Sequence, residues 1–179
     1  VFPGIQFPYH KHVSVFGNFA SGMEFPMMAN DGDMGNDLSD FYDLVAHEIA
    51  HSYFPFQVNT NEKLYSWMDE SWVTNFGIVF TKDNGLNYPP FFNWLDNIGW
   101  NTFRDLPPMV PTKNLHQMEF MHQSYVRPKF SNLFLLEMFE EKGLPSPIKA
   151  YIERWAGKHP TPYDFFFTIN DLFGENLDW

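Results

Sequence analysis

One helical segment near the start of this chain constrains the fold more than any other feature of the sequence. From Asp40 to Tyr53, apolar residues recur with the 3.6-residue spacing of an α-helix and cover a broad arc of its surface. The remaining wedge of that helix holds His47, Glu48 and His51, which form an HExxH pattern. A helix that is buried on most sides and keeps one polar strip needs something for that strip to bind.

The spacing of the two histidines indicates a metal site. Side chains four residues apart on a helix project from the same face, so the imidazoles of His47 and His51 can reach one ion. Glu70 follows His51 after eighteen intervening residues and supplies a carboxylate. Two imidazoles and one carboxylate leave a fourth position open for water, as in catalytic rather than structural zinc sites. Glu48 lies beside these ligands, where it can accept a proton from that water.

Coincidence is a poor explanation of this pattern. With this content of histidine and glutamate, an HExxH string arises by chance in roughly one chain in seventy, and a matching Glu70 lowers the frequency to roughly one in a thousand. Neither the five remaining histidines nor the Asp-containing segment 30–36 has the spacing of a ligand set. We therefore expect one Zn²⁺, held by His47, His51 and Glu70.

Composition and charge narrow the possible partners. A hydrophobic content of 44%, with 20% aromatic residues, can bury a sizeable core in one large domain or two closely packed subdomains. The formal net charge of −11 argues against nucleic acid or an anionic membrane surface as partner, because either would repel the chain. The chain has no cysteine, so metal ligands must come from histidine and carboxylates. No apolar run approaches the length of a membrane-spanning segment.

The first part of the chain is predicted to form a small sheet that precedes the HExxH helix. Two strand-like runs, 12–19 and 23–28, are separated by a short turn, and the segment 30–36 is typical of a loop. Asp37 or Ser39 is expected to cap the HExxH helix at its start.

The second part is predicted to be helical. Pro55 ends the HExxH helix, an exposed connector spans 57–63, and a helix from Trp67 to Phe80 brings Glu70 back to the metal. Capping and stop signals predict further helices, and prolines predict an extended loop; the helices are 91–103, 130–142, 147–157 and 162–174, and the loop is 105–113. The expected fold class is therefore α+β and mostly helical.

These motifs resemble those of the gluzincin metallopeptidases, and among them the M1 aminopeptidase family, whose catalytic domain is thermolysin-like. Ser21–Phe25 (SGMEF) is similar to the family's GxMEN strand, and Trp67–Ser71 (WMDES) is similar to its WLNEG motif. The resemblance spans roughly residues 17–136. It implies that 1–179 is a single catalytic-domain fragment, with residues 1–60 as sheet plus zinc helix and 61–179 as the helical part. It also implies that a parent protein has an N-terminal β-domain and further C-terminal helices absent here.

The resemblance also implies roles for residues outside the ligand set. Glu24 would bind the free α-amine of a peptide, which sets the cut one residue from the terminus. Gly22 and Met23 would offer backbone groups to the peptide as an added strand. Tyr125 is the best match to the family's tyrosine that donates a hydrogen bond to the oxyanion. Weaker candidates for that tyrosine are Tyr88, Tyr151 and Tyr163.

The sequence thus predicts a zinc-dependent aminopeptidase that acts on peptides with a free N-terminus. Alternatives are a thermolysin-like endopeptidase, a glycyl aminopeptidase, or a non-catalytic M1-like scaffold that binds partners. The intact Glu48 argues against a scaffold, which has no need of a base. Asp43 and Asn75 are candidates for orienting the zinc-binding imidazoles. The oligomeric state is left open, and the location leans towards extracytoplasmic or cell envelope.

Overall fold

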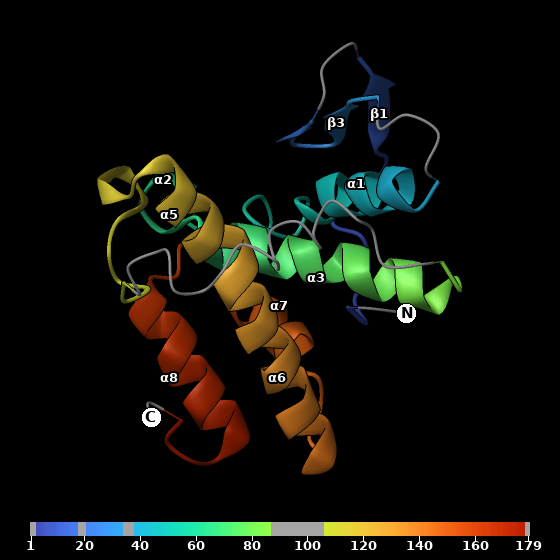
Figure 1. The fold of residues 1–179 in the computed structure, drawn as a ribbon. Helices are drawn as coiled ribbons and strands as arrows, with labels where there is room; N and C mark the ends of the chain where they lie inside the picture. Colours follow the sequence, from blue (N-terminus) through green and yellow to red (C-terminus); the bar gives the residue numbers. More distant parts are fainter. Residues whose placement is uncertain (1–2, 18–20, 34–37, 87–105, 178–179) are drawn as a thin grey trace.

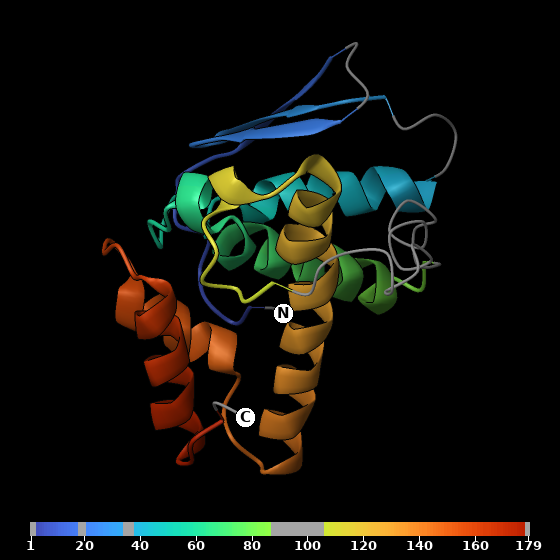
Figure 2. The ribbon, with the colours of Figure 1, turned by 60° about the vertical axis from the view of Figure 1, so that its left-hand side comes forward.

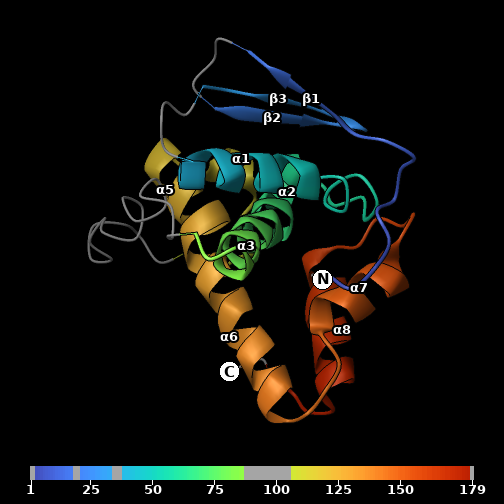
Figure 3. The ribbon, with the colours of Figure 1, turned by 90° about the vertical axis from the view of Figure 1, so that its right-hand side faces the viewer.

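The computed structural model of the protein describes residues 3–17, 21–33, 38–86 and 106–177. Figure 1 shows a small sheet above helix α1, helix α3 beneath α1, and a group of helices below them. Figure 3, which looks along α3, shows the sheet, α1 and α3 as three successive layers. The prediction of a mostly helical chain with a small sheet is confirmed. None of the helices in the described ranges combines the length and the apolar content that a membrane span requires.

The sheet has three strands where two were predicted. They are β1 (Val13–Phe16), β2 (Gly22–Phe25) and β3 (Met28–Asp31), in the order β1-β3-β2. The central strand β3 is parallel to β1 and antiparallel to β2.

The run 23–28 was predicted as one strand, and this is wrong. Pro26 has no backbone N–H, and Met27 adopts a positive φ of 65°, so the chain turns there. Met28 then begins β3, which runs through Asn30 and Asp31 into the segment predicted as a loop.

Helix α1 spans Leu38–Ala50 and lies directly under the sheet (Figures 2 and 3). Ser39 is inside this helix, so the prediction that Ser39 caps it is wrong, and Asp37 lies outside the described residues. The helix ends at Ala50, and turns occupy the following residues through Gln57, so Pro55 follows the end rather than causing it.

The connector between α1 and α3 is not uniformly exposed, as was predicted for 57–63. Val58 is fully buried in the apolar core and Thr60 is 7% exposed. A short helix, α2 (Glu62–Tyr65), follows, and α3 runs from Trp67 to Asp83, three residues beyond the predicted end. Burial of Val58 therefore anchors the connector to the core shortly before α2.

Helices α1 and α3 approach each other closely at a glycine. A Cβ on Gly77 of α3 would overlap the carboxylate of Asp43 on α1. Glycine in a helix interior costs stability relative to alanine. Here it permits the contact between the two helices that carry the HExxH pattern and Glu70.

The remaining helices are η2 (Thr112–Asn114), α5 (Gln117–Met121), the π-helical turn η3 (His122–Val126), α6 (Arg127–Glu141), α7 (Pro147–Trp155) and α8 (Pro162–Phe173). Of these, α5 and the start of α6 lie beside the pair of α1 and α3, whereas α7 and α8 lie below it and form the lower part of the molecule (Figures 1 and 2). The predicted start and stop of α8 are confirmed by a Thr161–Asp164 capping box and by Gly174 in the left-handed region. The helix predicted over 91–103 lies outside the described residues.

An aromatic core joins α3 to the lower helices. Trp72 on α3 is fully buried, and Trp67 on the same helix meets Phe165 of α8 edge to face with ring centroids 5.3 Å apart. Phe54, just after α1, stacks on Tyr151 of α7 with centroids 6.2 Å apart. Such pairs add stability beyond the area that they bury. The start of α3, which carries Glu70, is therefore held in a packed region.

Candidate metal centre and peptidase site

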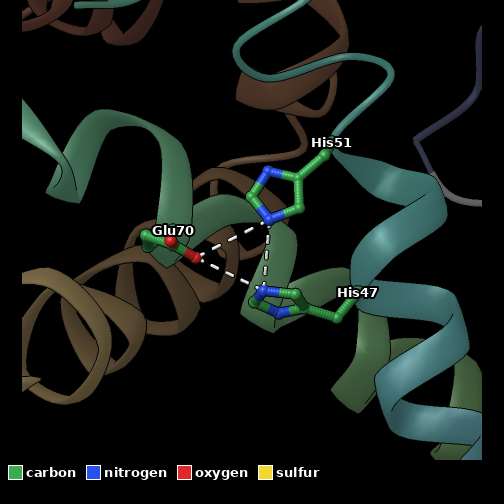
Figure 4. Close-up of side chains that lie close together, drawn as sticks. All are labelled: His47, His51 and Glu70. Carbon is green, nitrogen blue, oxygen red and sulfur yellow. Dashed lines mark hydrogen bonds and ion pairs between the residues drawn. The ribbon is translucent and has the colours of Figure 1, made fainter. Parts of the chain in front are cut away.

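Three side chains predicted as metal ligands converge on one point. His47 lies in the last turn of α1, His51 follows directly after the last residue of that helix, and Glu70 lies in the first turn of α3 (Figure 4). Oε2 of Glu70 is 3.3 Å from Nε2 of His47 and 3.7 Å from Nε2 of His51, and the two Nε2 atoms are 3.3 Å apart. Ligands about 2.0–2.1 Å from a tetrahedral zinc lie about 3.3 Å from one another. The spacing of these three atoms therefore fits a zinc ion.

The second nitrogen of His51 is held by a residue that the sequence reasoning missed. Nδ1 of His51 lies 2.9 Å from Oδ1 of Asp69 and 2.8 Å from the carbonyl oxygen of Phe54. Both partners are acceptors, so Nδ1 carries the proton and Nε2 keeps its lone pair for a metal. Burial alone would lower the pKa of His51, but the carboxylates of Asp69 and Glu70 raise it well above its usual value. The one feature of the sequence that could have identified Asp69 as a partner of His51 is its position directly before Glu70.

Asp43 and Asn75, predicted as partners of the imidazoles, do not act in this way in the structure. Within the described part of the chain, no hydrogen bond joins either of them to His47 or His51, and Nδ1 of His47 has no hydrogen-bond partner. Asp43 is buried, and this burial raises its pKa to about 7.

Glu48 lies beside the ligand set under the backbone of β2. It is 5% exposed, and its Oε2 has no hydrogen-bond partner among the described residues. A Cβ on Gly22 would overlap its carboxylate, so the strand can pass this close only because residue 22 is glycine. Burial raises the pKa of Glu48 to about 7, against the opposing effect of the two imidazoles. A carboxyl group with such a pKa can both accept and return a proton near neutral pH.

Strand β2 also carries Glu24 to the site. Its carboxylate is half-buried and lies within 4.8 Å of ligand atoms of both Glu48 and His51. Gly22 and Glu24 share one face of β2, and Met23 between them is 45% exposed on the other. Because β2 is at the edge of the described sheet, its free backbone groups can pair with an added strand.

Tyr125 reaches the site from the π-helical turn η3. Its hydroxyl donates a hydrogen bond to Oε1 of Glu70 over 2.6 Å, and its ring stacks on His47. Burial and the Glu70 carboxylate raise its pKa well above the usual value, so it remains a donor. The other tyrosine candidates do not compete, since Tyr151 is in the apolar core, Tyr163 is 61% exposed, and Tyr88 lies outside the described residues.

The helical position of Tyr125 differs from the prediction. It was expected just before a helix that starts at Phe130, whereas α6 starts at Arg127 and Tyr125 lies in the π-helical turn that leads into it. Such turns widen a helix locally and are frequent at functional sites.

The fold thus brings an HExxH pattern and a glutamate of the next long helix together at one point, in an arrangement that fits a metal ion. The structure is similar to solved M1 zinc metallopeptidases. A crystal structure of a mutant M1 zinc metallopeptidase from Deinococcus radiodurans has a TM-score of 0.70 at 13% identity, covering 94% of this chain and 38% of that chain. The same mutant bound to a Tyr-Ser-Ala substrate has a TM-score of 0.73 and the same identity, covering 94% and 37%.

Sequence comparison finds aminopeptidases. Leucine aminopeptidase 2 of Aspergillus fumigatus is 28% identical over 172 residues, which are 88% of this chain and 27% of that protein. The puromycin-sensitive aminopeptidase of Caenorhabditis elegans is 22% identical over 146 residues, which are 75% of this chain and 15% of that protein. No protein-family model matches the chain. The resemblance to M1 zinc metallopeptidases is confirmed, and the chain spans less than a third of the length of these curated relatives.

Proposed function

We propose that this chain forms the catalytic region of a zinc-dependent aminopeptidase with a thermolysin-like catalytic domain. The observation that carries the proposal is the convergence of His47, His51 and Glu70, with Glu48 and the strand of Glu24 directly beside them. The aminopeptidase names of the sequence relatives and the peptide bound to a structural neighbour support peptides as substrates.

Each side chain of this site has a proposed chemical role in peptide hydrolysis. A zinc ion bound by His47, His51 and Glu70 would supply Lewis acidity, which lowers the pKa of water and polarises a carbonyl group. Glu48 takes the proton from the attacking water and returns it to the leaving amine. Tyr125 donates its hydroxyl proton in a hydrogen bond to the oxyanion that develops on the carbonyl.

The neighbouring strand would position the substrate. Glu24 pairs with the α-ammonium of the peptide, so that only the first peptide bond reaches the reacting groups. Gly22 and Met23 offer backbone hydrogen bonds to the peptide along the edge of β2. We further propose that residues 1–179 belong to one catalytic domain, and that the whole protein acts outside the cytoplasm or in the cell envelope, which cell fractionation would test.

The proposal can be tested with leucine 4-nitroanilide and its N-acetyl form, using the full-length natural protein. The free amine should be hydrolysed and the acetylated form should not, with zinc present by metal analysis. Glu48→Gln should keep zinc and lower kcat by about 10²- to 10⁴-fold, whereas the exposed Glu141→Gln on α6 should change neither. Substantial activity in zinc-loaded Glu48→Gln protein would contradict the role of Glu48 as base.

The same assay separates the alternatives. Equal hydrolysis of blocked and free substrates would leave Glu24 without a role and favour an endopeptidase. Zinc binding without hydrolysis of any peptide would favour a scaffold. Preference for N-terminal glycine across a series of aminoacyl substrates would favour a glycyl aminopeptidase.

A further inference from the structure

A lysine is buried at the start of α6, which lies beside the two helices that carry the candidate zinc ligands (Figures 1 and 2). Lys129 lies in the first turn of α6 and is 1% exposed. Its Nζ lies 4.5 Å from the centroid of the Phe130 ring, which belongs to the same helix. Lysine is almost never fully buried unless it is paired with an opposite charge, because taking an ammonium group out of water is costly. The burial of Lys129 therefore indicates an electrostatic role.

The charge of Lys129 acts on Asp43 of α1. Asp43 is 3% exposed, and its carboxylate faces Gly77 where α1 and α3 approach each other. Burial raises the pKa of Asp43 to about 7, although His47 and Lys129 act to lower it. Asp40, which lies one turn earlier on α1, acts to raise it. The attraction between Lys129 and Asp43 therefore joins the start of α6 to α1.

This attraction lies one helical turn from a second contact between the same two parts of the chain. The ring of Tyr125 stacks on the ring of His47, with centroids 6.4 Å apart. Lys129 follows Tyr125 by four residues, and Asp43 precedes His47 by four. Residues four apart on a helix share a face and lie about 6 Å apart along its axis. The two contacts therefore follow in antiparallel order, and one register of α6 against α1 makes both.

The register of α6 against α1 also decides where the hydroxyl of Tyr125 lies. This hydroxyl donates a hydrogen bond to Oε1 of Glu70 over 2.6 Å. The π-helical turn that carries Tyr125 runs directly into α6 at Arg127, so the two move together. A displacement of about 1 Å at a reacting group can lower a rate by about 10²-fold. An interaction that fixes the start of α6 can therefore act on catalysis without contact with the substrate.

We infer that Lys129 is a positioning residue, whose attraction to Asp43 holds the hydroxyl of Tyr125 where an oxyanion develops. This inference rests on the proposed peptidase function and deepens it, because it assigns the placement of the oxyanion donor to a residue outside the ligand set. The neighbouring Phe130 ring cannot have this role, since it belongs to α6 itself and sets no register between helices.

The first test compares Lys129→Met with the zinc-loaded full-length parent on leucine 4-nitroanilide, at pH 8, where Asp43 is largely ionised. We expect kcat to fall about tenfold and KM to stay within about twofold, because a misplaced donor weakens stabilisation of the transition state alone. Zinc affinity should not change. Lys129→Arg keeps the charge and should keep kcat within about threefold of the parent. Lys149→Met, which removes a 46% exposed lysine of α7, should change neither kinetic constant.

A double-mutant cycle separates this role from general support of the fold. In a Tyr125→Phe background, Lys129→Met should lower kcat by less than about twofold, because the donor that it positions is already absent. Asp43→Asn removes the attraction from the other side and should give the same pattern, so it carries the test if Lys129→Met does not fold. Crystal structures supply a measurement that needs no activity. In Lys129→Met, the hydroxyl of Tyr125 should lie beyond hydrogen-bond distance of Glu70.

Several results would overturn the inference. A fall in kcat of equal size with and without the Tyr125 hydroxyl would mean that Lys129 supports the fold as a whole. An unchanged kcat in Lys129→Met, or an unmoved Tyr125 in its crystal structure, would leave Lys129 without a positioning role. Loss of zinc would mean that Lys129 supports the metal ligands instead. If the parent hydrolyses no peptide, the proposed function fails, whereas the crystal structures still decide whether Lys129 positions Tyr125.

Discussion

The hydrogen bond between His51 and Asp69 should control the affinity of the site for zinc. Asp69 accepts from Nδ1 of His51 over 2.9 Å, and both side chains are about 1% exposed. Partners of this kind fix the tautomer and orientation of a metal-binding imidazole, and their loss typically weakens metal binding by about 10- to 100-fold. The carbonyl oxygen of Phe54 lies 2.8 Å from the same nitrogen and remains an acceptor when Asp69 is replaced, so it limits the loss of zinc affinity. We therefore expect Asp69→Ala to weaken zinc binding by about tenfold, or about 1.4 kcal/mol.

The assay is competition for zinc against a chelator of known affinity, at a fixed pH near 7. Asp69→Asn keeps an acceptor at nearly the same position and should weaken binding less than Asp69→Ala. Asp43→Asn is the matched control, because Asp43 is also a buried aspartate near the ligands but forms no hydrogen bond with His47 or His51. It should change zinc affinity by less than about threefold. An equal loss in the Asp43 and Asp69 variants would refute the assignment, because general disturbance of buried carboxylates would then explain both.

Three further substitutions test other parts of the site. Tyr125→Phe should keep zinc but lower kcat on an aminoacyl substrate by about 10²- to 10³-fold, measured by steady-state kinetics, because a donor to the oxyanion is lost. Gly22→Ala should lower kcat by at least about tenfold without loss of zinc, because the new methyl group displaces the carboxylate of Glu48. Gly77→Ala should lower the free energy of unfolding by about 1–3 kcal/mol in chemical denaturation, because the new methyl group overlaps Asp43.

Each of these has an outcome that would contradict it. Tyr163→Phe removes a hydroxyl from a 61% exposed residue and should leave kcat unchanged, so an equal loss in both tyrosine variants would contradict the role of Tyr125. If Gly22→Ala loses zinc, the new methyl group disturbs the metal ligands themselves and not only the carboxylate of Glu48, which contradicts the prediction. A more stable Gly77→Ala protein would mean that helix propensity outweighs the contact between α1 and α3.

The HExxH helix could be predicted because two sequence patterns coincide in it. Its apolar residues follow the helical period, and its two histidines lie together on the remaining polar face. The prediction of a helix and the prediction of a pair of metal ligands therefore agree with each other. Helix α8 could be predicted equally well, because its start and stop signals are local and depend on no distant contact; these signals are Thr161, Pro162 and Gly174.

Features that depend on distant contacts were missed. Strand β3 lies in a stretch rich in turn-forming residues, and its pairing with β1 and β2 stabilises it despite that composition. Val58 is a single apolar residue in a polar connector, and only the core formed by later helices buries it. Candidate partners for the imidazoles were predicted within the two ligand-bearing helices at Asp43 and Asn75, yet the observed partner is Asp69.

The position of Asp69 follows from the way α3 crosses α1. Consecutive residues on a helix point about 100° apart, so Asp69 and Glu70 can contact opposite nitrogens of the single His51 ring. The other point of contact is Gly77 against Asp43. Asp43 precedes His51 by eight residues and Gly77 follows Asp69 by eight, so an antiparallel pair matches both contacts over about 12 Å on each helix. Because both contacts must hold in one register, a shift of α3 that breaks the packing at Gly77 must also misplace Glu70 and its neighbour at the metal site.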